Sequence, residues 1–169
     1  MKFHLVDRII RIEPGKRILT VKALSLAEEY LADHFPTFPV MPGVLMLEAM
    51  VQSAAWLTRV QQDFSRSIVV LSCAKNVRYA SFVAPGHVLH CDVEAVEIGE
   101  GAAKFKASAT VEDRQAVSCR LELKCFNLRD RHAYLAQSDE DIVRQLRQRF
   151  KLVGGPEALA AAAAAPAGA

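Results

Sequence analysis

An apolar segment at residues 44–57 limits the possible folds more than any other feature of this sequence. Only three of its side chains are polar, and they belong to Glu48, Gln52 and Ser53. Pro42 precedes the segment, and proline is favoured in the first turn of a helix. We therefore expect one long helix from near Pro42 to about Asp63, roughly 30 Å in length. A helix that is apolar on nearly every side has to be covered on nearly every side.

Strands that can cover this helix follow it in the sequence. They are expected in the segments SIVVLSCAKNVRY, HVLHCDVEAVEI, AAKFKASATVED and QAVSCRLELKCFNL. In the third segment, alternate residues over 105–111 are apolar and those between them are polar, and residues 117–125 of the fourth repeat the pattern. Alternation with a period of two predicts strands that have one covered face. Residues 99–101 and 113–114 are expected to form the turns between strands.

Two short apolar-rich segments lie before the helix, within residues 3–24. Pro14 and Gly15 stand between them at the middle of a four-residue connection, which predicts a hairpin. A short helical turn is expected over residues 26–32. Together these elements predict an α+β fold, in which a curled antiparallel β-sheet wraps a long central helix. The expected chain order is a hairpin, the helix and then an antiparallel meander.

We expect this domain to occupy residues 1–130. Residues 131–153 predict a helical extension, because an acidic helix start at 138–141 precedes apolar residues that share one face. From residue 154 to residue 169 the chain is mostly alanine and has no side chains able to build a core. We expect that tail to be disordered, or at best a frayed helix.

Composition excludes several classes of protein. Hydrophobic residues make up 51% of the 169 residues and charged residues 24%, as in ordinary globular domains. The net charge of +2 and the lack of a Lys/Arg cluster argue against nucleic acid as a partner. No segment has the length or continuity of a membrane span or a signal peptide. The four cysteines, Cys73, Cys91, Cys119 and Cys125, form no CxxC pair. We therefore expect them to be reduced core residues and expect no metal site and a cytoplasmic protein.

Glu48 is the residue that a buried helix explains least. Burial disfavours the ionised form of a carboxyl group, and a carboxyl group that stays protonated near neutral pH is a proton donor. Gln52, one helical turn further on, could hydrogen-bond this group and orient it. The alternatives are that Glu48 pairs with a basic residue such as Arg78 or Arg59, or that it points to solvent.

His34 lies just before the helix, in a loop stiffened by prolines. Pro36, Pro39 and Pro42 hold it at a fixed offset from the helix start. Gly43 allows a ligand to approach free N–H groups at the helix N-terminus, where an oxygen that gains negative charge is stabilised. A base, an acid and an oxyanion site are therefore expected within one short stretch, although a lone histidine is also compatible with a structural role.

The segment HFPTFPVMPGVLMLEAMVQ, residues 34–52, resembles the active-site segment of the 3-hydroxyacyl-[acyl carrier protein] dehydratases with the hot-dog fold. The glutamate-bearing FabZ-like branch fits better than the FabA-like branch, which carries aspartate. The resemblance extends to VDRIIRIEPGKRI in the hairpin, to NVRYASFVAPGHVL after the helix and to AKFKASATV in a later strand. It covers roughly residues 3–127.

This resemblance implies a hot-dog fold whose chains pair through their sheets, with active sites at the homodimer interface. It also allows assembly as a trimer of dimers. It implies that His34 takes a proton from C2 of the acyl thioester. Glu48 of the partner chain would protonate the departing hydroxyl group, and Gln52 would support it. The backbone N–H of Gly43 would polarise the thioester carbonyl. The implied partner is acyl carrier protein, and no metal or organic cofactor is implied.

The sequence departs from the family pattern at several positions. Asp33 and Thr37 stand where the family has glycines, and Asp33 would favour a protonated imidazole over a neutral base. Ala80 and Ser81 replace a basic pair that helps to dock the carrier protein. Candidates for docking are then Lys75 and Arg78, although solvated surface is an equally simple role. Candidates for lining an acyl tunnel are Tyr79 and Phe82, unless they are core aromatics.

Two other functions remain open beside the dehydratase. A hot-dog thioesterase would direct the acid toward activating water. A non-catalytic subunit would bind acyl chains or pair with an active homologue, in keeping with the replaced glycines and basic pair. Retention of both His34 and Glu48 favours catalysis, because a binding module has no use for a buried acid.

Overall fold

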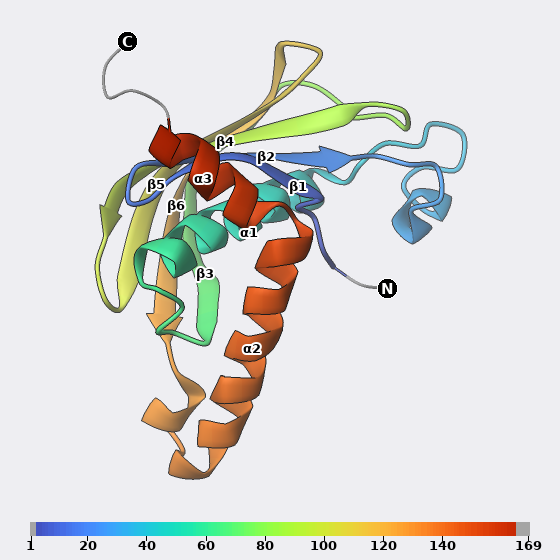
Figure 1. The fold of residues 1–169 in the computed structure, drawn as a ribbon. Coiled ribbons are helices and arrows are strands. Elements are labelled where there is room, and N and C mark those ends of the chain that lie inside the picture. The colour runs from blue at the N-terminus through green and yellow to red at the C-terminus, as the bar shows by residue number, and fades with distance from the viewer. Residues whose placement is uncertain (1–2, 165–169) are drawn as a thin grey trace.

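A computed structural model describes residues 3–164 as one sheet, one long central helix and a helical extension (Figure 1). The elements follow in the order β1 (Arg8–Glu13), β2 (Arg17–Ala23), the short 3-10 helix η1 (Glu29–Ala32), α1 (Gly43–Gln61), β3 (Ile68–Tyr79), β4 (Val88–Ile98), β5 (Ala102–Val111), β6 (Arg114–Phe126), η2 (Leu128–Asp130), η3 (Ala133–Leu135), α2 (Ala136–Leu152) and α3 (Gly155–Ala164). Within these residues, no helix is long and apolar enough to cross a membrane.

The six strands form one antiparallel sheet in the order β1-β2-β4-β5-β6-β3. The hairpin of β1 and β2 is confirmed, and Gly15 adopts a φ of 72° in its turn, where a residue without Cβ is favoured. The predicted four-strand meander is wrong in one respect, because β3 pairs with β6 and not with β4. Both sides of β4 are taken, one by β2 and the other by β5. The strand that follows the helix therefore lies at the far edge of the sheet.

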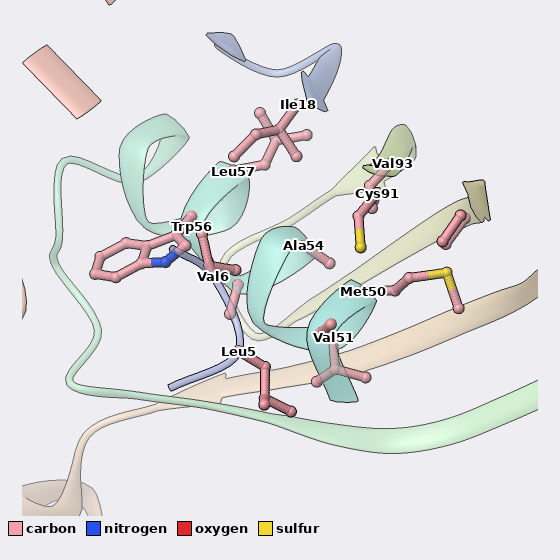
Figure 2. Packing of buried hydrophobic residues seen from close by; sticks show 14 of the residues in the cluster. Leu5, Val6, Ile18, Met50, Val51, Ala54, Trp56, Leu57, Cys91 and Val93 are labelled. Atoms are coloured by element: carbon pink, nitrogen blue, oxygen red, sulfur yellow. The ribbon is translucent and has the colours of Figure 1, made fainter. Parts of the chain in front are cut away.

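The sheet curls around α1, which confirms the predicted fold class (Figure 1). Alternate residues of β5 and β6 are buried, as the period-two pattern predicts. Figure 2 shows Met50, Ala54 and Leu57 of α1 among core side chains that include Ile18 and Cys91. The helix begins at Gly43, directly after Pro42, and ends two residues before the predicted end. One stripe of α1 is not covered: Val44 is 68% exposed, and Glu48 and Gln52 are only partly buried.

The carboxyl-terminal part is attached to the domain by a buried carboxylate. Asp139 is 1% exposed and accepts hydrogen bonds from the N–H groups of Leu128 and Arg129, from the Arg129 guanidinium and from the Ser67 hydroxyl. Burial opposes the charge on Asp139, but these donors outweigh it and lower its pKa from 3.8 to about 2. The beginning of α2 is thereby fixed to one end of the β3–β6 pair, where β3 begins and β6 ends.

Residues 155–164 form the helix α3, where the sequence predicted disorder or at best a frayed helix. A Cβ on Gly155 would lie 2.3 Å from the Phe150 ring, so the absence of a side chain lets α3 turn back closely against α2. Ala158 is buried in the core cluster, and the N–H of Ile9 in β1 donates to the carbonyl of Val153 (2.7 Å). The small side chains of α3 therefore allow it to pack closely against β1 and α2, although the sequence of this segment has few large apolar residues that would predict such packing. Residues 165–169 of the predicted tail lie outside the described residues.

Candidate active site

The loop that carries His34 is held by backbone hydrogen bonds at both ends. The N–H of His34 donates to the carbonyl of Tyr30 (3.1 Å), and the N–H of Val40 donates to the carbonyl of His34 (3.0 Å). Beyond the loop, the N–H of Met41 donates to the carbonyl of Val83 (2.8 Å). The segment before α1 is thus fixed by its own hydrogen bonds and by the β3–β4 connection, in addition to its prolines.

The His34 ring has a defined orientation. Its Nδ1 lies 2.9 Å from the carbonyl oxygen of Val40. A carbonyl oxygen can only accept a hydrogen bond, so Nδ1 carries the proton of the neutral ring. Nε2 is then the unprotonated nitrogen, which is the form that a general base requires. The ring also stacks on Phe35 with 4.2 Å between ring centroids, and no hydrogen bond or ion pair joins it to Asp33 within the described part of the chain.

Glu48 is held by Gln52, as the helical spacing predicts. Gln52 Nε2 donates to Glu48 Oε1 over 2.9 Å, and it also lies 3.0 Å from the carbonyl oxygen of Phe3. Gln52 Oε1 accepts a hydrogen bond from the N–H of Leu5 (2.9 Å). Among residues 3–164, Glu48 has no ion pair with Arg78 or Arg59, so the predicted alternative of a structural ion pair is wrong for the single chain. The amino-terminal segment supports Gln52 through backbone atoms, and the sequence carried no signal for that contact.

The first turn of α1 presents free N–H groups. No side chain among residues 3–164 caps the helix, and the first amides that bond within it are those of Leu45 and Met46, which donate to the carbonyl of Pro42. Gly43 lies against Tyr79: a Cβ built on Gly43 would be 2.9 Å from Tyr79 Cε1. Burial raises the pKa of the Tyr79 phenol, which keeps it neutral at physiological pH. Gly43 thus brings an aromatic ring close to the helix N-terminus.

Exposed apolar side chains surround this helix start. The ring of Phe38 packs edge-to-face on that of Phe82 at 5.6 Å between centroids. Such a concentration of exposed apolar surface marks a binding or association site. Its members, with their exposed fractions, are Phe35 (50%), Phe38 (53%), Val44 (68%), Tyr79 (49%) and Phe82 (65%). Tyr79 and Phe82 are therefore exposed near the candidate site, and the core alternative for them does not hold in the single chain.

His34 and Glu48 do not share a hydrogen-bond partner within one chain. His34 bonds to the loop, whereas Glu48 bonds to Gln52 on the stripe of α1 that the sheet leaves uncovered. Of the docking candidates on β3, Lys75 pairs with Glu122 (2.6 Å) and Arg78 is exposed. Cys91 and Cys119 are poor nucleophiles, since burial raises the pKa of Cys91 to about 12 and that of Cys119 to about 11.

Comparison with known proteins identifies the family. The FabA-like domain model matches residues 1–120. The chain belongs to the FabA-like family. It is 42% identical over 126 residues to the 3-hydroxyacyl-[acyl-carrier-protein] dehydratase FabZ of Cupriavidus taiwanensis, covering 73% of this chain and 83% of that protein. It is 36% identical over 114 residues to the FabZ of Ruminiclostridium cellulolyticum, covering 68% of this chain and 80% of that protein.

Solved structures agree with this FabA-like fold. The dehydratase heterocomplex ApeI:P from Xenorhabdus doucetiae matches with a TM-score of 0.63 at 16% identity, covering 79% of this chain and 90% of that one. The PaaI protein of Escherichia coli, from the phenylacetic acid degradation operon, matches with a TM-score of 0.53 at 10% identity, covering 70% and 78% of the two chains. At these identities the likeness concerns the fold alone. The family match ends at residue 120, so η2, η3, α2 and α3 lie outside it.

Proposed function

We propose that this chain is a 3-hydroxyacyl-[acyl carrier protein] dehydratase, which removes water from a 3-hydroxyacyl thioester to give a trans-2-enoyl thioester in fatty-acid or related acyl-chain synthesis. The curated relatives that carry this name match most of the chain at about 40% identity. The observation that carries the proposal is the hydrogen bond between His34 Nδ1 and the carbonyl of Val40. In the neutral ring this bond makes Nε2 the unprotonated nitrogen, within the family's active-site segment and next to the start of the long helix.

The proposed reaction needs a base, an acid and a stabilised oxygen. His34 Nε2 removes a proton from C2 of the acyl chain, and the electron pair forms the C2–C3 double bond as the C3–O bond breaks. Glu48 in its protonated form donates a proton to the departing hydroxyl group, which leaves as water. N–H groups at the start of α1, Gly43 among them, stabilise the thioester oxygen while the negative charge develops. Water addition in the reverse direction returns both protons.

We propose further that each active site contains His34 of one chain and Glu48 of another. The edge of β1 is covered by the α2–α3 junction through the Ile9–Val153 hydrogen bond. The outer edge of β3 has no strand beside it within residues 3–164, and its Val70 and Leu71 are 45% and 37% exposed. An unpaired edge of this length is a template for strand pairing. A homodimer paired through β3, three of which could assemble as a trimer of dimers, would also cover the exposed apolar residues at the start of α1.

The partner that presents the substrate is proposed to be acyl carrier protein, an acidic protein. Lys75 and Arg78 lie on the edge strand β3, but Lys75 is already paired with Glu122. Arg78 is therefore the better candidate for a charge contact, since an exposed cation on the rim of an interface mainly speeds association. A cytoplasmic location agrees with this partner and stays a prediction.

The test is incubation of the purified protein with a 3-hydroxyacyl carrier-protein thioester, followed by mass spectrometry of the carrier. We expect loss of water, and gain of water when the enoyl thioester is supplied, because the equilibrium favours hydration. Free acid in place of an enoyl thioester would identify a thioesterase. If no carrier-protein thioester is converted, whatever the length of its acyl chain, the catalytic proposal is overturned. A non-catalytic acyl-binding or partner subunit is then favoured.

A further inference from the structure

A groove separates α1 from α2 on the side of α1 that the sheet does not cover. Its volume is about 480 Å³, within the range of roughly 300–1,000 Å³ that is usual for small-molecule sites. Aromatic and aliphatic side chains from three parts of the chain form its walls, and they include Phe3, Trp56, Leu146 and Leu152. Figure 2 shows Trp56 pointing to the other side of α1 from Cys91. Because α2 lies beyond the residues that match the family, this groove is not made by the shared fold alone.

Two arginines give the groove its charge. Arg59 and Arg149 both line it, and none of the lining side chains in the described part of the chain is acidic. Within residues 3–164, neither guanidinium has an ion pair or a hydrogen bond, and the buried Nε of Arg59 has no acceptor. The Arg59 guanidinium lies over the Trp56 ring, 5.5 Å from its centroid. Burial lowers the pKa of Arg59 to about 10, which still leaves it protonated at neutral pH.

We propose that this groove binds a single-chain amphiphilic anion, such as a medium-chain carboxylate, with its head group at Arg59 and Arg149 and its hydrocarbon chain along Phe3 and Leu152. A partly buried guanidinium whose Nε has no acceptor is unfavourable, and a carboxylate would supply the missing acceptor in the geometry that arginine binds best. Two large apolar side chains that line the groove are exposed, which is unusual for a solvated surface: Leu152 is 81% exposed and Phe3 is 54% exposed. A hydrocarbon chain would remove both from water.

Gln52 connects the groove to the candidate acid, since it lines the groove and also donates to Glu48. An occupant would therefore touch the residue that orients Glu48. This consequence rests on the proposed dehydratase function, whereas the binding of the anion does not.

The test uses Trp56, which is the single tryptophan of the chain. Dodecanoate brominated on its chain is titrated into the protein below its micelle concentration, because bromine quenches tryptophan fluorescence on contact. We expect saturable quenching by one equivalent per chain. Arg149→Gln should weaken the apparent affinity about tenfold or more, as loss of a charge-assisted contact does. The matched control is Arg144→Gln on the same helix, which does not line the groove and should leave the affinity unchanged.

A brominated dodecanol has the same chain length as the dodecanoate but no charge, so it separates the contribution of the charge to affinity from that of the hydrocarbon chain. We expect the alcohol to bind at least about tenfold more weakly than the acid. Equal quenching by the alcohol and the acid, or equal affinity of the wild type and Arg149→Gln, would overturn the anion site. Only non-specific binding of the hydrocarbon chain would then remain. No quenching, together with a change of oligomeric state in Arg149→Gln, would also overturn it, because a second copy of the chain would then fill the groove. The measurement needs no turnover, so its failure is distinct from failure of the proposed function.

Discussion

Gln52 Nε2 donates a hydrogen bond of 2.9 Å to Glu48 Oε1 from one turn further along α1. The same amide group bonds to the backbone of Phe3 and Leu5, which lie more than 45 residues away in sequence. Gln52 therefore links the amino-terminal segment to Glu48, so the orientation of the candidate acid depends on where that segment lies. A side chain that holds a reacting group in this way affects the rate of the chemical step more than substrate binding.

Gln52→Ala is expected to lower kcat about tenfold with little change in KM, because Glu48 loses its orientation but stays in place. The free energy of unfolding should fall by about 1–2 kcal/mol, since the N–H of Leu5 loses its acceptor. Steady-state kinetics and urea unfolding measure the two effects. Gln61→Ala, an exposed position on the same helix, serves as the control. An unchanged kcat in Gln52→Ala would show that Glu48 does not depend on this contact.

The contact between Gly43 and Tyr79 predicts a different effect. In Gly43→Ala, a Cβ would meet Tyr79 Cε1 at 2.9 Å and displace a ring that is about half exposed. Because the ring can move and alanine favours the helix, the free energy of unfolding should change by less than about 1 kcal/mol. The displaced ring should nevertheless lower kcat/KM several-fold, if it lines the path of the acyl chain. Enzyme kinetics on the folded variant measure this effect.

A double-mutant cycle tests whether the Tyr79 ring causes the effect of Gly43→Ala. In a Tyr79→Ala background, Gly43→Ala should stabilise the protein, because only the gain in helix propensity remains. The coupling between the two positions should then be about 0.5 kcal/mol or more. Additive free energies of unfolding would show that the ring does not limit the space at Gly43.

The sequence predicted α1 and the faces of β5 and β6 because these features depend on local periodicity. It did not predict where β3 lies, since nothing in residues 68–79 specifies pairing with β6 over β4, and that choice depends on contacts 38 to 58 residues away, from Tyr79↔Val117 to Ile68↔Phe126. The same limit applies to the site. His34 and Glu48 follow from a contiguous motif, whereas the support of Gln52 comes from backbone atoms of Phe3 and Leu5, which carry no residue-specific signal.

Asp139 predicts an acid-labile attachment of the carboxyl-terminal helices. Its pKa is lowered from 3.8 to about 2 in the folded chain, so its contribution to stability is complete above pH 4 and is lost as the pH falls toward 2. Asp139→Asn should reduce the free energy of unfolding by about 1–3 kcal/mol at pH 7, because buried donors lose a charged acceptor. It should also flatten the pH dependence of stability between pH 4 and pH 2. Urea unfolding across that range tests this, with Asp141→Asn, a more exposed residue of the same helix, as the control. Parallel pH curves for wild type and Asp139→Asn would contradict the assignment.

The shared active site gives the sharpest prediction. His34→Ala and Glu48→Gln should each lower turnover by about 10²–10⁴-fold without unfolding the chain, as loss of a general base or acid does. If His34 and Glu48 of different chains form each site, a mixed dimer of the two variants contains one site with both substitutions and one site with neither. Random reassortment of the two variants should then restore about a quarter of the wild-type activity.

The control is the doubly substituted chain mixed with wild type. In that mixture, every hybrid dimer has one defect in each of its two sites, so activity should come only from wild-type dimers and again amount to about a quarter. The same mixture would retain about half of the activity if both residues of a site came from one chain, and the two single variants would then restore none. Leu71→Asp on the exposed edge of β3 should abolish both the dimer and the restored activity, because a charge on a pairing edge opposes strand addition. Sedimentation of the Leu71→Asp protein and the activity of the two mixtures therefore decide together whether His34 and Glu48 meet across an interface.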